Sequence, residues 1–579
     1  MQSVTSDGGS NPPEPPYRPT AAGLVRHIAE TYGDRLSQVG GADRMSFRDL
    51  ERRSALYARG LLASGVTKGS RVALMMPNGP EFVAAFLAAA RIGALVAPLS
   101  TLYQAPELSW VLNNADIQVL MIADRYLRHD YLARLEEAFP SLRGQTAGRL
   151  VLPQAPYLRS ILVWGEGRRD WAHPGPETLK AVAAERPEFD EALLAAVEAN
   201  VAPADLLCII HTSGSTAEPK GVVHSHGAMM RHSYQKAFHY WSFGEGDVLV
   251  GVRPFFWIAG LAASMFQILQ AGRTLFTPDD DTAATVVKLI ETEGVNAVCS
   301  SEAWMASLRA DPALEEAGYE LFRLAQDTGA LARRTPQGPV FLNPLRAKAT
   351  PHPVHPHPDQ IARSYGMTET LSAHTTIPSG TLLPDDKHRT CGRPIPGVKL
   401  RIVDQETRQP VPPGQVGEAE VAGYSLMMGL YKKERQDTFT PDGFYRTGDL
   451  LSEDADGYLT FSNRIGDMIK VHGANVAPLE VERAIEALPQ IARAAVVGLP
   501  DPDGGSVLVA AVEVRAGREF DEASIRAELR TKLSSFKVPR RILALEPEEF
   551  PLTGSGKIVK SGLRPILGAR LEAEDTTAS

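Results

Sequence analysis

Residues 211–221, with the sequence HTSGSTAEPKG, bring hydroxyl side chains, glycines and a lysine together directly after the apolar run Leu206–Ile210. Hydroxyls and backbone N–H groups can donate to phosphate oxygens, and Gly214 lets the backbone approach a ligand closely. The ammonium group of Lys220 adds a point charge suited to the β- and γ-phosphates of a nucleotide. The spacing is not that of a Walker A loop. A flexible Ser/Gly turn is the alternative interpretation, but the preceding apolar strand favours a phosphate-binding loop.

Three further segments join a carboxylate or a lysine to a glycine turn: YGMTET at 365–370, YRTGDL at 445–450 and PLTGSGKI at 551–558. The carboxylate of Glu369 is the ligand that a hard cation beside a triphosphate needs. Asp449 can accept hydrogen bonds from both hydroxyls of a ribose, and Lys557 can stabilise developing negative charge. Taken singly, the three would be a capped turn, half of a surface ion pair and a solvated lysine.

In this order, the four segments resemble the signatures of the superfamily of adenylate-forming enzymes. That superfamily comprises acyl-CoA synthetases, the adenylation domains of nonribosomal peptide synthetases and firefly luciferases. The similarity runs from about residue 25 to residue 565, and Ala217 stands where family members usually have Gly. Within the superfamily, the chain most resembles an AMP-dependent acyl-CoA synthetase or ligase.

The resemblance implies a role for each matching residue. Tyr365 would stack beneath the adenine, and Asp449 and Arg464 would reach the ribose. Lys557, Glu369 and Lys220 would be the catalytic residues, and Mg²⁺ would be held at Glu369 and Thr216. The implied ATP or AMP contacts are Thr212, Ser213, Gly214, Ser215, Thr216, Lys220, Tyr365, Thr368, Asp449, Arg464 and Lys557.

Similar enzymes run two half-reactions with ATP, Mg²⁺ and CoA. A carboxylate attacks the α-phosphorus of ATP and pyrophosphate leaves, which gives an acyl-adenylate. The C-terminal domain then swings about a hinge, and the thiol of CoA expels AMP to form a thioester. The resemblance puts the hinge at Gly466, where the family usually has Asp or Lys, and the wall of the CoA tunnel at Gly473. Glycine can absorb a large change of backbone angles, so a hinge at Gly466 is expected.

The implied acyl pocket contains Trp257, Gly329, Ala330 and Gly366. Trp257 stands in a motif where many members have His, and its alternative is a plain core aromatic. Asp327 and Thr328 replace the first glycines of the family's pocket wall. Since no basic residue marks a second carboxylate and no aspartate marks a substrate amine, an apolar or aromatic acid is favoured.

Other classes of protein stay open beside the acyl-CoA ligase. The main alternative enzyme is a stand-alone adenylation protein that loads a carrier protein; a luciferase-like oxygenase is more distant. A homologue that has lost catalysis and acts as a binding protein is the alternative outside the enzymes. The departures at Ala217, Gly466 and Asp327 motivate it, and the retained Glu369 and Lys557 argue against it.

Composition excludes several partners. The formal net charge is −9, which argues against a nucleic-acid partner. Cys208, Cys299 and Cys391 are too few and too scattered for disulfides or a zinc site, so a reducing cytoplasm is expected. No signal peptide and no membrane span is predicted, because Arg91 and Gly93 interrupt the apolar stretch 83–97 and Pro98 ends it. The expected partners are a small carboxylic acid, ATP and CoA, with a homodimer left open.

The elements that must position these residues alternate between helix-like and strand-like patterns, which predicts an α/β fold with parallel-type sheets covered by helices. Short strands over 390–462 predict a β-rich subdomain, and segments after 467 predict a small mobile α+β C-terminal domain. The predicted division is a disordered tail at 1–20, an N-terminal AMP-binding domain at 21–465, a C-terminal domain at 466–570 and a tail at 571–579, with a Pro/His-rich loop insertion at 335–358.

Overall fold

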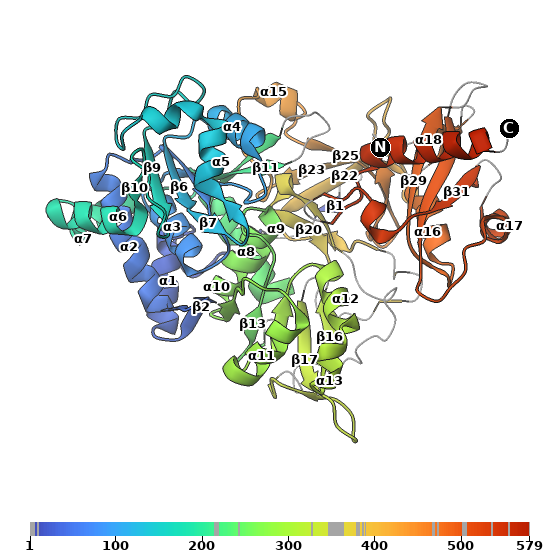
Figure 1. Ribbon diagram of the computed structural model, residues 1–579, viewed down its shortest axis with the longest axis horizontal. Coiled ribbons are helices and arrows are strands. Elements are labelled where there is room, and N and C mark those ends of the chain that lie inside the picture. Colours follow the sequence, from blue (N-terminus) through green and yellow to red (C-terminus); the bar gives the residue numbers. More distant parts are fainter. Residues whose placement is uncertain are drawn as a thin grey trace. The chain divides into compact units, whose positions relative to one another are not determined.

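The computed structural model describes residues 6–7, 11–212, 219–240, 244–325, 328–345, 364–377, 383–384, 387, 390–465, 469–471, 474–476, 478–500, 506–533, 537–553 and 556–577. The chain forms two compact units. The larger contains Ser6–Leu400 and Val421–Tyr445, and the smaller contains Arg401–Glu420 and Arg446–Ser579. The elements are labelled in Figure 1.

The helices of the larger unit are α1 Ala21–Tyr32, α2 Phe47–Ala63, α3 Pro80–Arg91, α4 Ala105–Asn114, α5 Tyr131–Ala138, α6 Gly175–Glu185, α7 Glu191–Ala199, α8 His226–Gln235, α9 Ile258–Gly260, α10 Gln267–Gln270, α11 Ala283–Glu293, α12 Glu302–Ala310, α13 Pro312–Glu316 and α15 Arg435–Thr438. Local chemistry explains several of their starts. Ser46 and Asp49 form a capping box at α2, and Pro80 opens α3 where a missing N–H costs nothing.

The first sheet of the larger unit carries the predicted phosphate loop. Its order is β10 His173–Pro174, β9 Ser160–Trp164, β6 Val119–Ala123, β4 Arg71–Met75, β5 Leu95–Pro98, β11 Leu206–Thr212, β12 Lys220–Ser225 and β24 Gly429–Leu430. Neighbouring strands from β10 to β11 are parallel. Strand β12 pairs antiparallel with β11, and β24 pairs antiparallel with β12. Parallel strands need helical crossovers, which accounts for the alternation seen in the sequence.

Helices cover both faces of this sheet. Val72 and Leu74 of β4 belong to a buried cluster with residues of α1, α2 and α3. Ala73 and Met75, which alternate with them, belong to another buried cluster with residues of α4 and α5. A strand that is apolar on both faces is expected where a parallel sheet lies between two helix layers.

The second sheet of the larger unit has the order β16 Tyr319–Ala325, β17 Thr328–Arg333, β15 Ala297–Cys299, β13 Val248–Val250, β14 Thr274–Phe276, β2 Leu36–Gly40 and β3 Asp43–Ser46, and β18 Val340–Phe341 pairs with β17. Helices α11, α12 and α13 lie beside its strands in Figure 1, and residues of all three join its buried cluster. This sheet holds Gly329 and Ala330 of the predicted acyl pocket in β17.

The short strands predicted after residue 390 are present. A three-stranded sheet has the order β19 Tyr365–Met367, β20 Ser372–Thr376 and β21 Arg393–Pro394, and a five-stranded sheet has the order β1 Ser6–Asp7, β22 Val398–Val403, β23 Gly417–Gly423, β25 Tyr445–Glu453 and β26 Leu459–Arg464. Two small pairs are β7 Arg125–Tyr126 with β8 His129–Asp130, and β27 Ile469–Val471 with β28 Ala474–Val476.

The end of the chain is an α+β layer structure. Strands β29 Ile491–Pro500, β30 Ser506–Val514 and β31 Arg541–Ala544 form one sheet. Helices α16 Pro478–Glu486 and α17 Glu522–Lys532 pack on one face, through a cluster that contains Val496. Helix α18 Lys560–Thr577 packs on the other, through a cluster that contains Val497. The predicted α/β fold class, with its β-rich part and a small C-terminal α+β domain, is confirmed.

The structure differs from the sequence predictions at the segments expected to be irregular. In the predicted tail 1–20, Glu14 pairs with Arg231 at 2.7 Å and the Tyr17 hydroxyl donates to Gln270 at 2.6 Å. In the predicted loop 335–358, residues 340–341 form β18, and residues 346–358 lie outside the described residues. Residues 571–577, predicted as a tail, continue α18, where Leu571 packs against the buried cluster.

The predicted domain boundary at 465–466 lies beside residues outside the description and stays a prediction. Among the described helices, none combines the length and the apolar character that crossing a bilayer requires.

Candidate active site

The predicted phosphate loop connects two adjacent antiparallel strands of the larger unit. Thr212 ends β11, Lys220 begins β12, and the two residues are register partners. Ser213, Gly214, Ser215 and Thr216, together with Ala217, lie outside the described residues. Both ends of the loop are therefore fixed by the sheet.

The turn that carries Glu369 follows β19. Residues Thr368–Thr370 form a single 3-10 turn, and the chain returns as β20. Gly366 permits this return, because a Cβ there would lie 2.0 Å from the carbonyl oxygen of Ser372. The Tyr365 ring is buried and meets the ring of His374 edge-on, with centroids 4.9 Å apart.

Three neutral groups hold this turn. The Thr368 carbonyl oxygen lies 2.8 Å from His224 Nε2, the Glu369 carbonyl accepts from the Met427 N–H at 2.8 Å, and the Tyr445 hydroxyl donates to Glu369 Oε1 at 3.3 Å. Burial lowers the pKa of His224 to about 4, while its hydrogen bond to Thr368 opposes this less strongly. His224 is therefore neutral at pH 7, and its Nε2–H is the donor.

His224 lies in β12, whose first residue is Lys220. The His224–Thr368 hydrogen bond thus joins the strand that closes the phosphate loop to the turn that presents Glu369. The structure brings two of the sequence segments together within one unit by this contact. Sequence reasoning missed His224 and gave Tyr445 no role, and the only signal was their presence in or next to the matching motifs.

The residues around Glu369 suit a magnesium ion that is shared with a nucleotide. Mg²⁺ in such sites takes one or two carboxylates plus substrate phosphates rather than a full protein cage. No group of three or more His, Cys, Asp or Glu residues within the described part of the chain could hold a metal by itself. Glu369 is half-buried, and its carboxylate is oriented by Tyr445. A single oriented carboxylate fits the ion that the sequence implied.

The acyl-pocket residues lie in three elements of the larger unit. Trp257 is half-buried before α9, with its ring 5.1 Å from that of Phe256. Gly329 and Ala330 are buried in β17, where their partners in β15 are Val298 and Ala297. A pocket wall formed by these residues stays a prediction, and Asp327 lies outside the described residues.

The predicted ribose contacts are adjacent in the smaller unit. Asp449 in β25 and Arg464 in β26 are register partners, with Arg464 Nε 3.6 Å from Asp449 Oδ1. The Asp449 residue is 6% exposed, whereas Arg464 is exposed. A buried carboxylate beside an accessible guanidinium can bind a polyol through both partners.

Lys557 lies in a closed turn of the smaller unit. Its N–H donates to Thr553 Oγ1 at 3.1 Å, and its carbonyl accepts from the Thr553 N–H at 2.7 Å. The bridge between Leu552 and Ile558 closes the turn. The backbone of Lys557 is therefore fixed while its side chain is exposed. Gly466 and Gly473, the predicted hinge and tunnel residues, lie outside the described residues.

Comparison with known proteins gives the class of this fold and site. The AMP-binding enzyme family matches residues 25–431, and its C-terminal domain family matches residues 480–557. The chain is 30% identical over 535 residues to 3-[(3aS,4S,7aS)-7a-methyl-1,5-dioxo-octahydro-1H-inden-4-yl]propanoyl:CoA ligase of Mycobacterium tuberculosis, which covers 91% of this chain and 95% of that one. It is 27% identical over 550 residues to the putative acyl-CoA synthetase YngI of Bacillus subtilis, with 94% and 96% covered.

Among solved structures, the ATP-bound MatB of Rhodopseudomonas palustris superposes with a TM-score of 0.71 at 25% identity, covering 94% of this chain and 99% of MatB. The chain belongs to the AMP-binding enzyme family, within the superfamily of adenylate-forming enzymes. It is an AMP-forming acid–CoA ligase, which activates a carboxylic acid with ATP and transfers the acyl group to CoA.

Proposed function

We propose that this ligase binds MgATP with the loop 212–220, the Glu369 turn, Asp449 and Arg464, and acts on an apolar or aromatic acid. The hydrogen bond between His224 and Thr368 carries the proposal, because it fixes the backbone of the turn that presents Glu369 relative to the strand that begins at Lys220. Tyr365 stacks beneath the adenine, and Thr368 contacts the phosphates. Glu369 and Thr216 would hold a magnesium ion, which would offset negative charge on the triphosphate.

In the first half-reaction, an oxygen of the substrate carboxylate attacks the α-phosphorus, and the bond from that phosphorus to the bridging oxygen breaks. Lys220 and Lys557 offset the negative charge that develops on the leaving pyrophosphate and on the α-phosphate. In the second, the CoA thiol attacks the acyl carbon, its proton passes to solvent, and AMP leaves. Gly466 is the hinge between the two half-reactions, and Gly473 lines the tunnel for the thiol arm.

The proposed acid class rests on the pocket residues. Trp257 supplies aromatic surface, and Gly329, Ala330 and Gly366 leave room beside it. Relatives named 3-hydroxybenzoate–CoA ligase and feruloyl-CoA synthase are 26% and 28% identical to this chain, which supports aryl acids as candidates beside aliphatic and ring-bearing ones.

The catalytic assignment is tested with Lys557→Ala. Once a substrate acid is known, we expect this variant to form adenylate about 10²–10³-fold more slowly, since one preorganised charge at the transition state is removed. Its melting temperature should stay that of the wild type, because the side chain of Lys557 is exposed. Adenylate formation at the wild-type rate would remove Lys557 from the mechanism.

We further propose a cytoplasmic location and a homodimer. The three cysteines are buried and lie far apart in the sequence, which fits a reducing compartment. Cell fractionation and light scattering of the purified protein test these two points, and a monomer of 62.7 kDa in solution would contradict the dimer.

A further inference from the structure

Strand β25 is kinked at Gly448, and the backbone of this kink, called the Thr447–Asp449 turn below, is held by strand β23. Thr447 Oγ1 donates to the Ala419 carbonyl at 2.8 Å and accepts from the Asp449 N–H at 3.1 Å. The N–H of Gly448 donates to Glu418 Oε1 at 3.3 Å. Gly448 has a φ of 70°. Glycine adopts positive and negative φ angles about equally readily, so the backbone at Gly448 can change conformation at little cost. The Glu418 carboxylate is the acceptor that opposes such a change.

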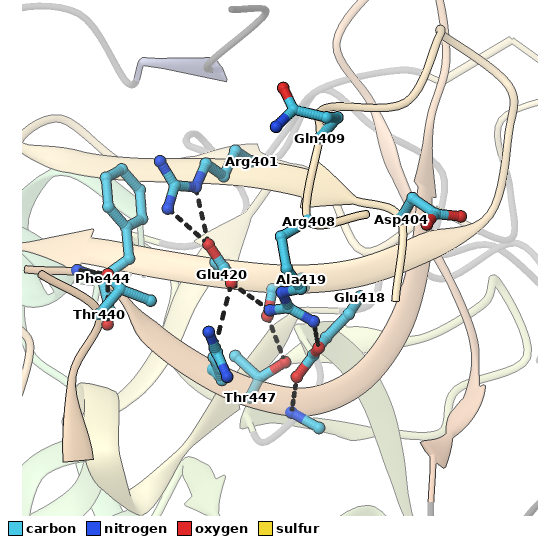
Figure 2. A network of polar contacts seen from close by, with 12 residues as sticks. Arg401, Asp404, Arg408, Gln409, Glu418, Ala419, Glu420, Thr440, Phe444 and Thr447 are labelled. Atoms are coloured by element: carbon cyan, nitrogen blue, oxygen red, sulfur yellow. Dashed lines mark hydrogen bonds and ion pairs between the residues drawn. The ribbon is translucent and has the colours of Figure 1, made fainter. Parts of the chain in front are cut away.

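Glu418 is buried and is itself held by Arg408, whose Nη1 pairs with Glu418 Oε2 (Figure 2). A turn centred on Asp404 fixes the position of Arg408: Asp404 Oδ1 accepts from the Thr407 N–H at 2.8 Å, and the Arg408 N–H donates to the Asp404 carbonyl at 3.0 Å. The pKa of Arg408 is raised, because its hydrogen bonds to the two glutamates outweigh the opposing effect of burial. Each oxygen of the Glu418 carboxylate thus has its own partner.

Glu420, two residues along the same strand, has a different set of partners. It pairs with Arg401 at 2.6 Å, with Arg408, and with Arg446 at 3.6 Å. Its side chain is 2% exposed, against 8% for Glu418. Within the described part of the chain, no hydrogen bond joins the Glu420 side chain to residues 447–449. The two glutamates therefore share strand, burial and an arginine partner, and only Glu418 contacts the turn (Figure 2).

We infer that Glu418 is a positioning residue that sets the enzyme's selectivity for the ribose hydroxyls by fixing the Gly448 N–H and hence the direction of the Asp449 carboxylate. The inference rests on the proposed role of Asp449 as the acceptor of those hydroxyls. If Glu418 is removed, the Gly448 N–H and the Arg408 guanidinium lose an acceptor, and the turn is free to reorient. The affinity lost is the part that depends on the ribose hydroxyls.

The test is equilibrium binding of ATP, 2′-deoxy-ATP and 3′-deoxy-ATP to the full-length protein with MgCl₂, followed by calorimetry, which needs no knowledge of the acid. We expect Glu418→Ala to weaken ATP binding about tenfold, which is the loss of one hydrogen bond to a charged group. The deoxy analogues should lose much less, so that the ratio of affinities falls toward one. Glu418→Gln keeps an oxygen acceptor for Gly448 and should retain most of the ratio.

The matched control is Glu420→Ala, which removes an equally buried, arginine-paired carboxylate and should lower the melting temperature without changing the ratio. Thr447→Val removes the other side-chain support of the turn and serves if Glu418→Ala does not fold; it should lower the ratio in the same direction. Equal ratios in the wild type, Glu418→Ala and Thr447→Val would overturn the inference, as would equal falls in Glu418→Ala and Glu420→Ala. If Asp449→Ala itself keeps the wild-type ratio, the proposed role of Asp449 fails instead.

Discussion

The Thr368–Thr370 turn of the larger unit and the Thr447–Asp449 turn of the smaller unit each present one carboxylate, and their supports differ in charge. Neutral groups support the first: an imidazole, a phenol and a backbone N–H. A buried carboxylate, itself paired with arginine, supports the second. A carboxylate that shares a metal ion with a triphosphate keeps its full charge beside neutral partners. A carboxylate that binds uncharged hydroxyls must point in one direction. A hydrogen bond to a charged acceptor holds its backbone more strongly than a hydrogen bond between neutral groups.

The largest effect that separates the two turns should come from Glu369→Gln. From the proposed role of Glu369 in offsetting the charge of the triphosphate, we expect the rate of adenylate formation to fall about 10²-fold at saturating ATP. Steady-state pyrophosphate exchange measures this rate. A variant that changes only the KM for ATP would show that Glu369 behaves like Asp449, and the contrast between the turns would not hold.

The next effect is that of Asp449→Asn. Loss of charge-assisted hydrogen bonds to the ribose should raise the KM for ATP about 10-fold or more, with little change in kcat. The matched measurement compares the wild type and Asp449→Asn with 3′-deoxy-ATP, for which their KM values should differ much less. A fall in kcat at unchanged KM would contradict the assignment.

The neutral histidines near the Thr368–Thr370 turn predict that the stability of the fold depends on pH. Burial lowers the pKa of His224 to about 4. Burial, together with the nearby charge of Lys236, lowers the pKa of His374 to about 3. Both imidazoles are therefore uncharged in the folded protein at neutral pH. In the unfolded chain they titrate near pH 6.5, so the unfolded state binds more protons below that pH and stability falls as pH decreases from 6.5. Each histidine should change the unfolding equilibrium by about tenfold per pH unit in this window.

Denaturant unfolding of the wild type and His224→Gln at pH 7.0 and 5.5 tests this. A glutamine can still donate to the Thr368 carbonyl and does not titrate, so the variant should lose less stability on acidification than the wild type. Equal losses would show that His224 is not a neutral buried group.

The smallest effect should be that of Tyr445→Phe. It removes a hydrogen bond of 3.3 Å to Glu369 while keeping the ring, which packs against Phe439. We expect kcat/KM for ATP to fall about threefold, as for loss of one ordinary hydrogen bond. A loss as large as that of Glu369→Gln would mean that Tyr445 has a chemical role beyond orienting the carboxylate.

Much of the fold could be predicted from the sequence, because the spacing of apolar residues indicates which faces of helices and strands are buried, and turn residues indicate where these elements end. The apolar patterns of residues 47–64 and 297–299 predict a helix and a strand, and the structure has helix α2 Phe47–Ala63 and strand β15 Ala297–Cys299 there. The C-terminal domain was predicted to end at residue 570, because Leu571 is the one large apolar residue in the segment 571–577 that continues helix α18. Strand β16 was not predicted, although it pairs antiparallel with β17, the next strand in the chain.

The site could be predicted as a set of motifs but not as a structure. Glu369, Asp449 and Lys557 were predicted from their segments, whereas His224 and Glu418, which hold two of these segments, lie outside them. Glu418 and Glu420 alternate along a strand that is otherwise apolar, so they face one side and, being buried, must be paired. That pattern was the available signal for a buried charged network. The arginines that satisfy it come from positions 401, 408 and 446, which no spacing rule connects.

This chain joins a carboxylic acid to CoA while it cleaves ATP to AMP and pyrophosphate. The most direct measurement is AMP release from ATP across short-, medium- and long-chain acids, aryl acids and bulky ring-bearing propanoates, each with and without CoA. We expect sustained AMP release to require both CoA and one class of apolar or aromatic acid, and to slow about 10²–10³-fold in Lys557→Ala. An adenylate that forms and that CoA fails to discharge would contradict the claim.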